Sequence, residues 1–148
     1  MRELSFVVTA NLMEKNGKIL LVQEGNPPAK GKWNFPAGKL ERDVDILENT
    51  IKEAKEETGY DVRLDGLVGI YHELRDGGTN PVIIVFKSSI VGGKLDPDKN
   101  EIMDAGWFTA EEIKKKDLRN LYILKSINDL KKRGLLQLET VSVNKMPQ

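Results

Sequence analysis

The stretch that decides the fold is residues 49–60, NTIKEAKEETGY, which lies between two apolar, strand-like runs. Asp45 precedes it as a typical N-cap residue, with Glu48 three positions later in a capping box, and Gly59 suits a helix C-terminus. We therefore predict a helix over about 46–58. Apolar residues at the spacing i, i+4, i+7 predict the stripe that packs on the core: Leu47, Ile51 and Ala54.

Glu53, Glu56 and Glu57 share one face of this predicted helix, because residues i, i+3 and i+4 are neighbours on a helix surface. Their mutual repulsion can be offset in two ways. Nearby lysines do so in an ordinary solvated helix. A divalent cation does so in a metal site, and a site made only of oxygen ligands favours Mg²⁺ or Mn²⁺ over zinc. The segment alone leaves both interpretations open.

Outside this helix, apolar runs alternate with turn sequences. Strands are predicted at 4–13, 18–23, 33–35, 60–74, 81–91 and 101–108, and further helices at 110–116 and 118–134. The loop 36–44 is predicted to be irregular. This order of elements predicts an α+β fold, with a mixed sheet and helices packed on it.

The composition is that of a soluble globular protein. The chain has 148 residues, of which 39% are hydrophobic and 31% charged, with zero formal net charge. We expect one domain over 1–148, with a core of about 4–133 and a C-terminal extension over 135–148 that begins as a strand. The absence of cysteine excludes disulfide and thiolate chemistry. The charge balance argues against nucleic-acid and membrane partners, and nothing indicates a signal peptide, so a cytoplasmic location is expected.

The residues from Gly38 to Tyr60 resemble the signature box of the Nudix (MutT-like) hydrolases, in which a glycine precedes a helix carrying three glutamates. The preceding sequence WNFPAG, residues 33–38, resembles the family's entry to this box. Glu101 resembles a late glutamate of the family. The resemblance covers about residues 6–113 and looks most like the small nucleoside tri- and diphosphatases of the family.

This resemblance implies a Nudix-type α/β/α sandwich with a mixed sheet between helices. It also implies hydrolysis of a phosphoanhydride bond by a metal-activated water, with Mg²⁺ as the cofactor and Mn²⁺ as the alternative. Catalytic roles fall on Glu53, Glu56, Glu57 and Glu101, and these four residues would hold the metal together with the backbone of Gly38. The roles of ligand and general base stay open among them.

The implied partner is a small molecule, namely a nucleoside di- or triphosphate or a related organic pyrophosphate. No motif of the ADP-ribose, NADH, coenzyme A or dinucleoside-polyphosphate subgroups is present. The alternative function is a non-catalytic Nudix-fold module that binds a nucleotide or regulates another protein. The oligomeric state, monomer or homodimer, stays open.

Two positions depart from the box. Val44 replaces a loop glutamate and Lys52 replaces a helix arginine, and in the family these two residues often tie the loop to the helix. We therefore expect this tie to be lost, with no loss of a metal ligand. Substrate-binding candidates are two lysines near the loop, which are alternatively solvated, and two aromatic residues, which are alternatively core: Lys32, Lys39, Trp33 and Phe35.

Overall fold

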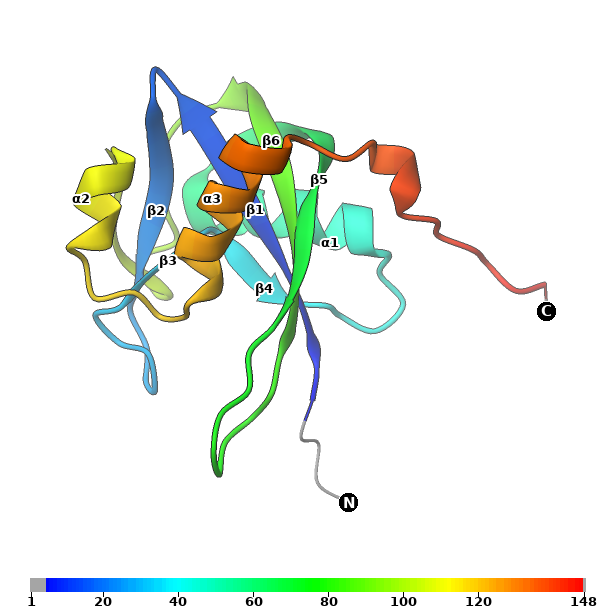
Figure 1. Cartoon of the computed structure of the whole chain (residues 1–148), viewed down its shortest axis with the longest axis horizontal. Helices are drawn as coiled ribbons and strands as arrows, with labels where there is room; N and C mark the ends of the chain where they lie inside the picture. Colours follow the sequence, from blue (N-terminus) through cyan, green and yellow to red (C-terminus); the bar gives the residue numbers. More distant parts are fainter. Residues whose placement is uncertain (1–4, 148) are drawn as a thin grey trace.

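The computed structural model describes residues 5–147, and its centre is a seven-stranded mixed sheet (Figure 1). The strands follow the order β3-β2-β1-β6-β5, while β4 pairs with β1 and β7 pairs with β2. Among the strand pairs of residues 5–147, β1 and β6 run parallel and the others run antiparallel. The strands are β1 (Val7–Lys15), β2 (Lys18–Glu24), β3 (Trp33–Asn34), β4 (Ala37–Lys39), β5 (Tyr60–His72), β6 (Val82–Gly93) and β7 (Ile102–Phe108).

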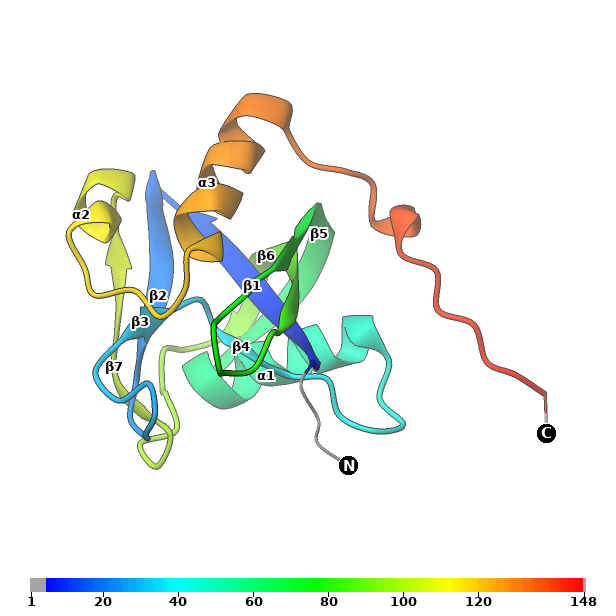
Figure 2. The same cartoon turned by 60° about the horizontal axis from the view of Figure 1, so that its bottom comes forward.

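Helices cover both faces of this sheet. Figure 2 shows α1 (Ile46–Thr58) below the sheet and α3 (Tyr122–Arg133) above it. The short helix α2 (Ala110–Lys114) packs against β7 and α3. The mixed sheet between helices confirms the predicted α/β/α sandwich.

Strand β1 is buried on both faces, and its two faces differ in chemistry. Ala10 and Leu12 belong to the apolar cluster that includes Tyr122 and Ile123 on the α3 side. On the α1 side, alternate residues of β1 are polar, and Thr9 and Asn11 hydrogen-bond to α1. Because side chains alternate across a strand, the α3 side of β1 is apolar, whereas its α1 side places Thr9 and Asn11 beside an apolar cluster that includes Met13 and Ala54.

The predicted ends of α1 are confirmed. Asp45 Oδ1 accepts the backbone N–H of Glu48 at 2.8 Å, and Gly59 adopts a left-handed conformation with φ of 85°. The predicted apolar stripe is confirmed at Ala54, which is buried, and at Leu47, which packs against the same apolar cluster, but it is wrong at Ile51, which is 39% exposed. The buried residues of the helix are mostly polar: Asn49, Thr50, Glu53, Ala54, Glu57 and Thr58.

Three further predictions differ from the structure. The loop 36–44 contains β4, which pairs with β1 and was not predicted. The expected strand after residue 134 is limited to one bridge between Leu136 and Leu67, followed by a short 3-10 turn over Leu138–Thr140. The first predicted strand begins at residue 4, which lies outside the described residues, and its described part starts at Val7. Among residues 5–147, no helix has the length and apolar character needed to cross a membrane.

Candidate active site

The buried carboxylates of α1 lie against the strand that follows the entry loop. Glu53 and Glu57 are only 8% and 6% exposed. Glu57 Oε1 accepts the backbone N–H of Ala37 at 2.9 Å. A Cβ atom at Gly38 would lie 2.2 Å from Cδ of Glu53, so only glycine fits here while the Glu53 carboxyl keeps its place.

The electrostatic cost of this arrangement appears in the pKa values. Burial, helped by the neighbouring carboxylates of Glu56 and Glu101, raises the pKa of Glu53 to about 7. Burial also raises the pKa of Glu57, although the hydrogen bond from Ala37 opposes this shift. Burial and nearby acidic side chains raise the pKa of Glu101 as well. The structure therefore brings the four predicted glutamates into mutual electrostatic range.

A fifth carboxylate, Glu24, belongs to this group and was missed in the sequence. It ends β2, and its proximity contributes to the raised pKa values of Glu57 and Glu101. Its Oε1 accepts from Nη1 of Arg119 at 3.1 Å and from Nδ2 of Asn34 at 3.4 Å. The sequence feature that could have identified Glu24 is its position as an acidic residue at the end of an apolar strand, directly before the proline-containing loop.

The donor set suits a hard divalent cation, because it consists of carboxylate oxygens with a nearby backbone that has no side chain at Gly38. Within residues 5–147, however, no three acidic or histidine side chains are already arranged as a compact metal-ligand group. The carboxylates are thus neighbours that would have to converge further to share one ion.

A cleft of ≈ 280 Å³ opens beside Gly38. Lys39, Arg75 and Arg119 line it, and no acidic side chain does so in the described part of the chain. Lys39 was a predicted substrate contact. The two arginines were missed, because one lies in the β5–β6 turn and the other between α2 and α3, where no local pattern points to a shared site.

The remaining predicted substrate contacts lie elsewhere. Phe35 is a correction: its ring is fully buried and packs edge-on against Tyr122, so no ligand reaches it. Trp33 packs against Phe108 with ring centroids 5.2 Å apart, and Lys116 lies 4.2 Å from its ring centroid. Lys32 Nζ lies 3.9 Å from Oδ1 of Asp117. Neither Trp33 nor Lys32 lines the cleft.

The expected loss of the loop-to-helix tie is also a correction. Lys52 Nζ lies 2.5 Å from Oε2 of Glu41, and both side chains are half-exposed. This ion pair joins the loop to α1 without an acidic residue at Val44. The loop is therefore tied to α1 through Glu41, which pairs with Lys52 in place of an acidic residue at position 44.

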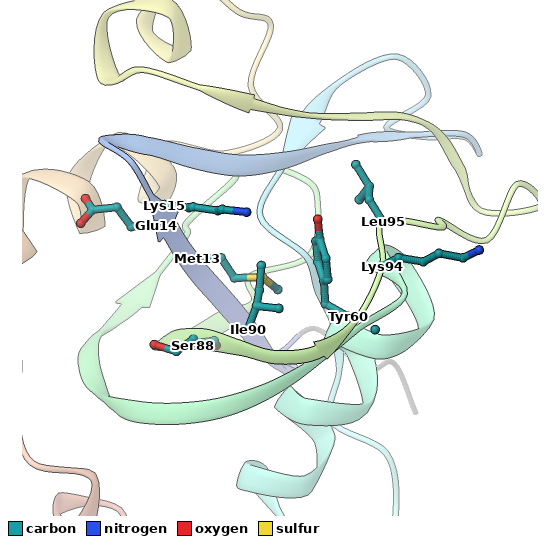
Figure 3. A pocket seen from close by; sticks show the side chains of 10 residues that line it. Met13, Glu14, Lys15, Tyr60, Ser88, Ile90, Lys94 and Leu95 are labelled. Carbon is teal, nitrogen blue, oxygen red and sulfur yellow. The ribbon is translucent and has the colours of Figure 1, made fainter.

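A larger hollow of ≈ 620 Å³ lies at the opposite end of β1. Figure 3 shows Met13, Tyr60 and Ile90 together around it, while Glu14 points away. None of the five carboxylates described above lines this hollow. The smaller cleft differs in that Ala37 and Gly38, which adjoin the carboxyl groups of Glu57 and Glu53, are part of its lining.

Comparisons with known proteins identify relatives of this chain. An ADP-ribose pyrophosphatase of Methanocaldococcus jannaschii is 36% identical over 60% of this chain and 53% of its own length. A putative nudix hydrolase of Caenorhabditis elegans is 31% identical over 74% of this chain and 30% of its own length. The chain thus spans about a third to a half of the length of these curated relatives.

A solved structure gives fuller coverage. A Nudix hydrolase from Nitrosomonas europaea superposes with a TM-score of 0.85 at 30% identity, covering 95% of this chain and 97% of its own. The family model described as NUDIX domain matches residues 3–126. These matches, together with the glutamate helix beside Gly38, show that the chain belongs to the Nudix family.

Proposed function

We propose that this chain hydrolyses a phosphoanhydride bond in nucleoside di- or triphosphates or related organic pyrophosphates, with Mg²⁺ as its cofactor and Mn²⁺ as the alternative. The observation that best supports this proposal is the position of the carboxylates. Glu53 lies against Gly38 and Glu57 against Ala37, with Glu24 and Glu101 as charged neighbours of Glu57, and Ala37 and Gly38 also line a cleft that contains three basic residues and no acidic one in its described lining. Names of Nudix relatives, such as ADP-ribose pyrophosphatase, support the reaction type.

We assign the roles as follows. Glu56 and Glu57 are metal ligands, Glu53 is a ligand or the general base, and Glu101 is an accessory ligand or base. The backbone near Gly38 completes the set, since a backbone without a side chain allows close approach. When bound, the divalent ion would neutralise phosphate charge and lower the pKa of a water molecule.

The chain's own residues then orient the substrate. Glu57 is held by the Ala37 N–H at 2.9 Å, so its carboxylate keeps a fixed direction relative to the loop. Lys39, Arg75 and Arg119 face the cleft, where cationic side chains favour phosphate oxygens. Arg119 is fixed by its 3.1 Å contact with Glu24, which links the basic wall to the acidic one.

The cleft also bears on the size of the substrate. Its ≈ 280 Å³ lies near the lower end of the range for small-molecule pockets, which begins at about 300 Å³. This volume supports a substrate with one small organic group attached to the diphosphate. A second nucleoside would have to lie outside the cleft.

The test is phosphate release from a panel of nucleoside di- and triphosphates, nucleotide sugars and small organic pyrophosphates, with Mg²⁺, with Mn²⁺ and with chelator. We expect release on at least one small substrate that chelator abolishes. Mn²⁺ should restore it. Release from none of them above background would leave the non-catalytic binding module as the better function.

A matched pair of variants locates the activity. Glu57→Gln removes a buried carboxylate, whereas Glu48→Gln changes an exposed one on the same helix. We expect the first to abolish release and the second to leave it unchanged. Equal activity in both variants would remove Glu57 from the metal site.

A further inference from the structure

Asn11 is a polar residue in the middle of a buried strand, and its side chain is fully enclosed. An unpaired amide in such a place costs about 1–3 kcal/mol. Asn11 avoids this cost, because both amide hydrogens and the amide oxygen have partners. Its Nδ2 donates to the carbonyls of Pro36 at 3.2 Å and Thr50 at 2.9 Å, and its Oδ1 accepts from Ser88 Oγ at 2.6 Å.

These partners belong to the two segments that build the site. Pro36 directly precedes the Ala37–Lys39 strand, and Thr50 lies one helical turn before Glu53. The backbone N–H of Asn11 also donates to the Pro36 carbonyl at 2.9 Å. One side chain therefore spans the gap between the Gly38 segment and the glutamate helix.

Ser88 on β6 sets the direction of the bridge. Because its hydroxyl donates to Oδ1, the Nδ2 group of Asn11 is left to face Pro36 and Thr50. Without Ser88, the amide could rotate and lose one of its two carbonyl partners. The bridge thus depends on a residue that touches neither segment of the site.

A second asparagine holds the far end of the same segment. Asn49 of α1 donates to Thr9 Oγ1 at 2.9 Å and accepts the backbone N–H of Glu41 at 3.3 Å. The segment 36–41 is thus attached to β1 and α1 at both ends. Apolar contacts would fill the same space, but they would not fix the segment along the helix as directional bonds do.

We propose that Asn11, oriented by Ser88, is a positioning residue that sets the spacing between the Gly38 backbone and the carboxylates of Glu53 and Glu57. This role rests on the proposed hydrolysis. Displacements of about 1 Å in such sites cost up to about 100-fold in rate. The network touches no reacting atom, so its effect reaches the reaction only through the segment it holds.

Ser88→Ala tests this role with little disturbance, because it removes one hydroxyl and leaves Asn11 in place. Ser126→Ala is its matched control. Both serines are buried, and Ser126 makes a single bond to the Ile123 carbonyl at 3.0 Å on the α3 side of the sheet. Both variants remove one buried hydroxyl and the hydrogen bond that it donates, but of the two serines only Ser88 bonds to Asn11.

Two readouts separate positioning from general stability. In the metal-free proteins, hydrogen–deuterium exchange at the backbone amides of 37–41 should be faster in Ser88→Ala and unchanged in Ser126→Ala. On a hydrolysed substrate, Ser88→Ala should lower kcat about three- to tenfold with little change in KM, because geometry and not binding is altered. Asn11→Ala should exceed both effects, provided that the variant is folded by circular dichroism.

The outcomes bear separately on the two proposals. Unchanged exchange at 37–41 in Ser88→Ala, or an equal change in Ser126→Ala, would overturn the positioning role even in an active enzyme. A wild-type protein that hydrolyses no substrate would overturn the proposed function. The exchange measurement would then still decide whether Asn11 and Ser88 hold this segment.

Discussion

Helices α1 and α3 pack on opposite faces of the same sheet, yet they bury opposite kinds of side chain. The face of α3 that meets the sheet is mainly apolar, with Tyr122 and Ile123 buried and Leu130 partly buried. The face of α1 buries two glutamates and leaves Ile51 39% exposed. An ordinary amphipathic helix shows the first pattern.

The two buried faces therefore have different consequences: that of α3 stabilises the fold, whereas that of α1 costs stability. Burying α3 lowers the free energy of the fold in the usual way, by removing apolar surface from water. Burying Glu53 and Glu57 opposes folding, because the pKa values of both groups are raised by desolvation. A helix that keeps such residues buried is placed for a ligand that compensates their charge. Substitutions in the two helices should therefore have opposite effects on stability and activity.

The largest expected effect is on activity, at Glu57. Glu57→Gln should lower kcat/KM by about 10³-fold, because several kcal/mol of charge stabilisation at a metal-assisted reaction is lost. Its amide oxygen can still accept the N–H of Ala37, so the melting temperature should not fall. Initial rates and thermal melts check both parts. A large loss of stability would show that Glu57 serves the fold instead.

The second effect is on stability, at Ile123 of α3. Ile123→Ala should lower the free energy of unfolding by about 2–4 kcal/mol, because it removes a fully buried side chain from the core. The kcat/KM of the folded protein should stay unchanged. Urea unfolding measures the loss, with Leu121→Ala at an 80% exposed position as the control. A comparable loss at both positions would contradict the assigned packing.

The third effect depends on pH, at Glu53. Its folded-state pKa of about 7 lies above the ordinary value of 4.5, so its contribution to stability is fully present below 4.5 and is lost as pH rises through 7. At about pH 8 without metal, Glu53→Gln should be more stable than the wild type by up to about 3 kcal/mol. The difference should vanish at about pH 4. Urea unfolding across this range measures it, and a pH-independent difference would contradict the burial cost.

The smallest effect is at Ile51 of α1. Ile51→Ser should change the free energy of unfolding by less than about 0.5 kcal/mol, because the side chain is partly solvated and lies outside the buried face. Chemical unfolding beside Ile123→Ala measures the contrast. A loss as large as that of Ile123→Ala would restore the apolar stripe predicted from the sequence.

These helices also show what the sequence could predict. The ends of α1 follow from Asp45 and Gly59, because capping is a local property of a few adjacent residues. The prediction of an apolar face on α1 failed at Ile51 and missed the burial of Asn49, whose side-chain partner Thr9 lies 40 positions away in the sequence. Only the folded chain reveals that a polar residue will find a partner there.

The residues of the candidate site also fall into those that could be predicted from the sequence and those that could not. The glutamates of α1 and Gly38 could be identified from their spacing, because they lie within one local motif. Glu24, Arg75 and Arg119 could not, because they come from three separate segments that meet only in the folded protein. Phe35 was proposed as a substrate contact from its chemistry alone, whereas burial depends on long-range packing.

The proposed role of the buried carboxylates of α1 is to bind a divalent cation, and the dependence of the melting temperature on Mg²⁺ concentration checks this role. At about pH 8, Mg²⁺ should stabilise the wild type in a saturable manner, by about 2.7 kcal/mol at 100 times its dissociation constant. Glu53→Gln and Glu57→Gln should start from equal or higher stability without Mg²⁺ and gain much less from it. Equal gains in all three proteins, or no gain in the wild type, would contradict the account.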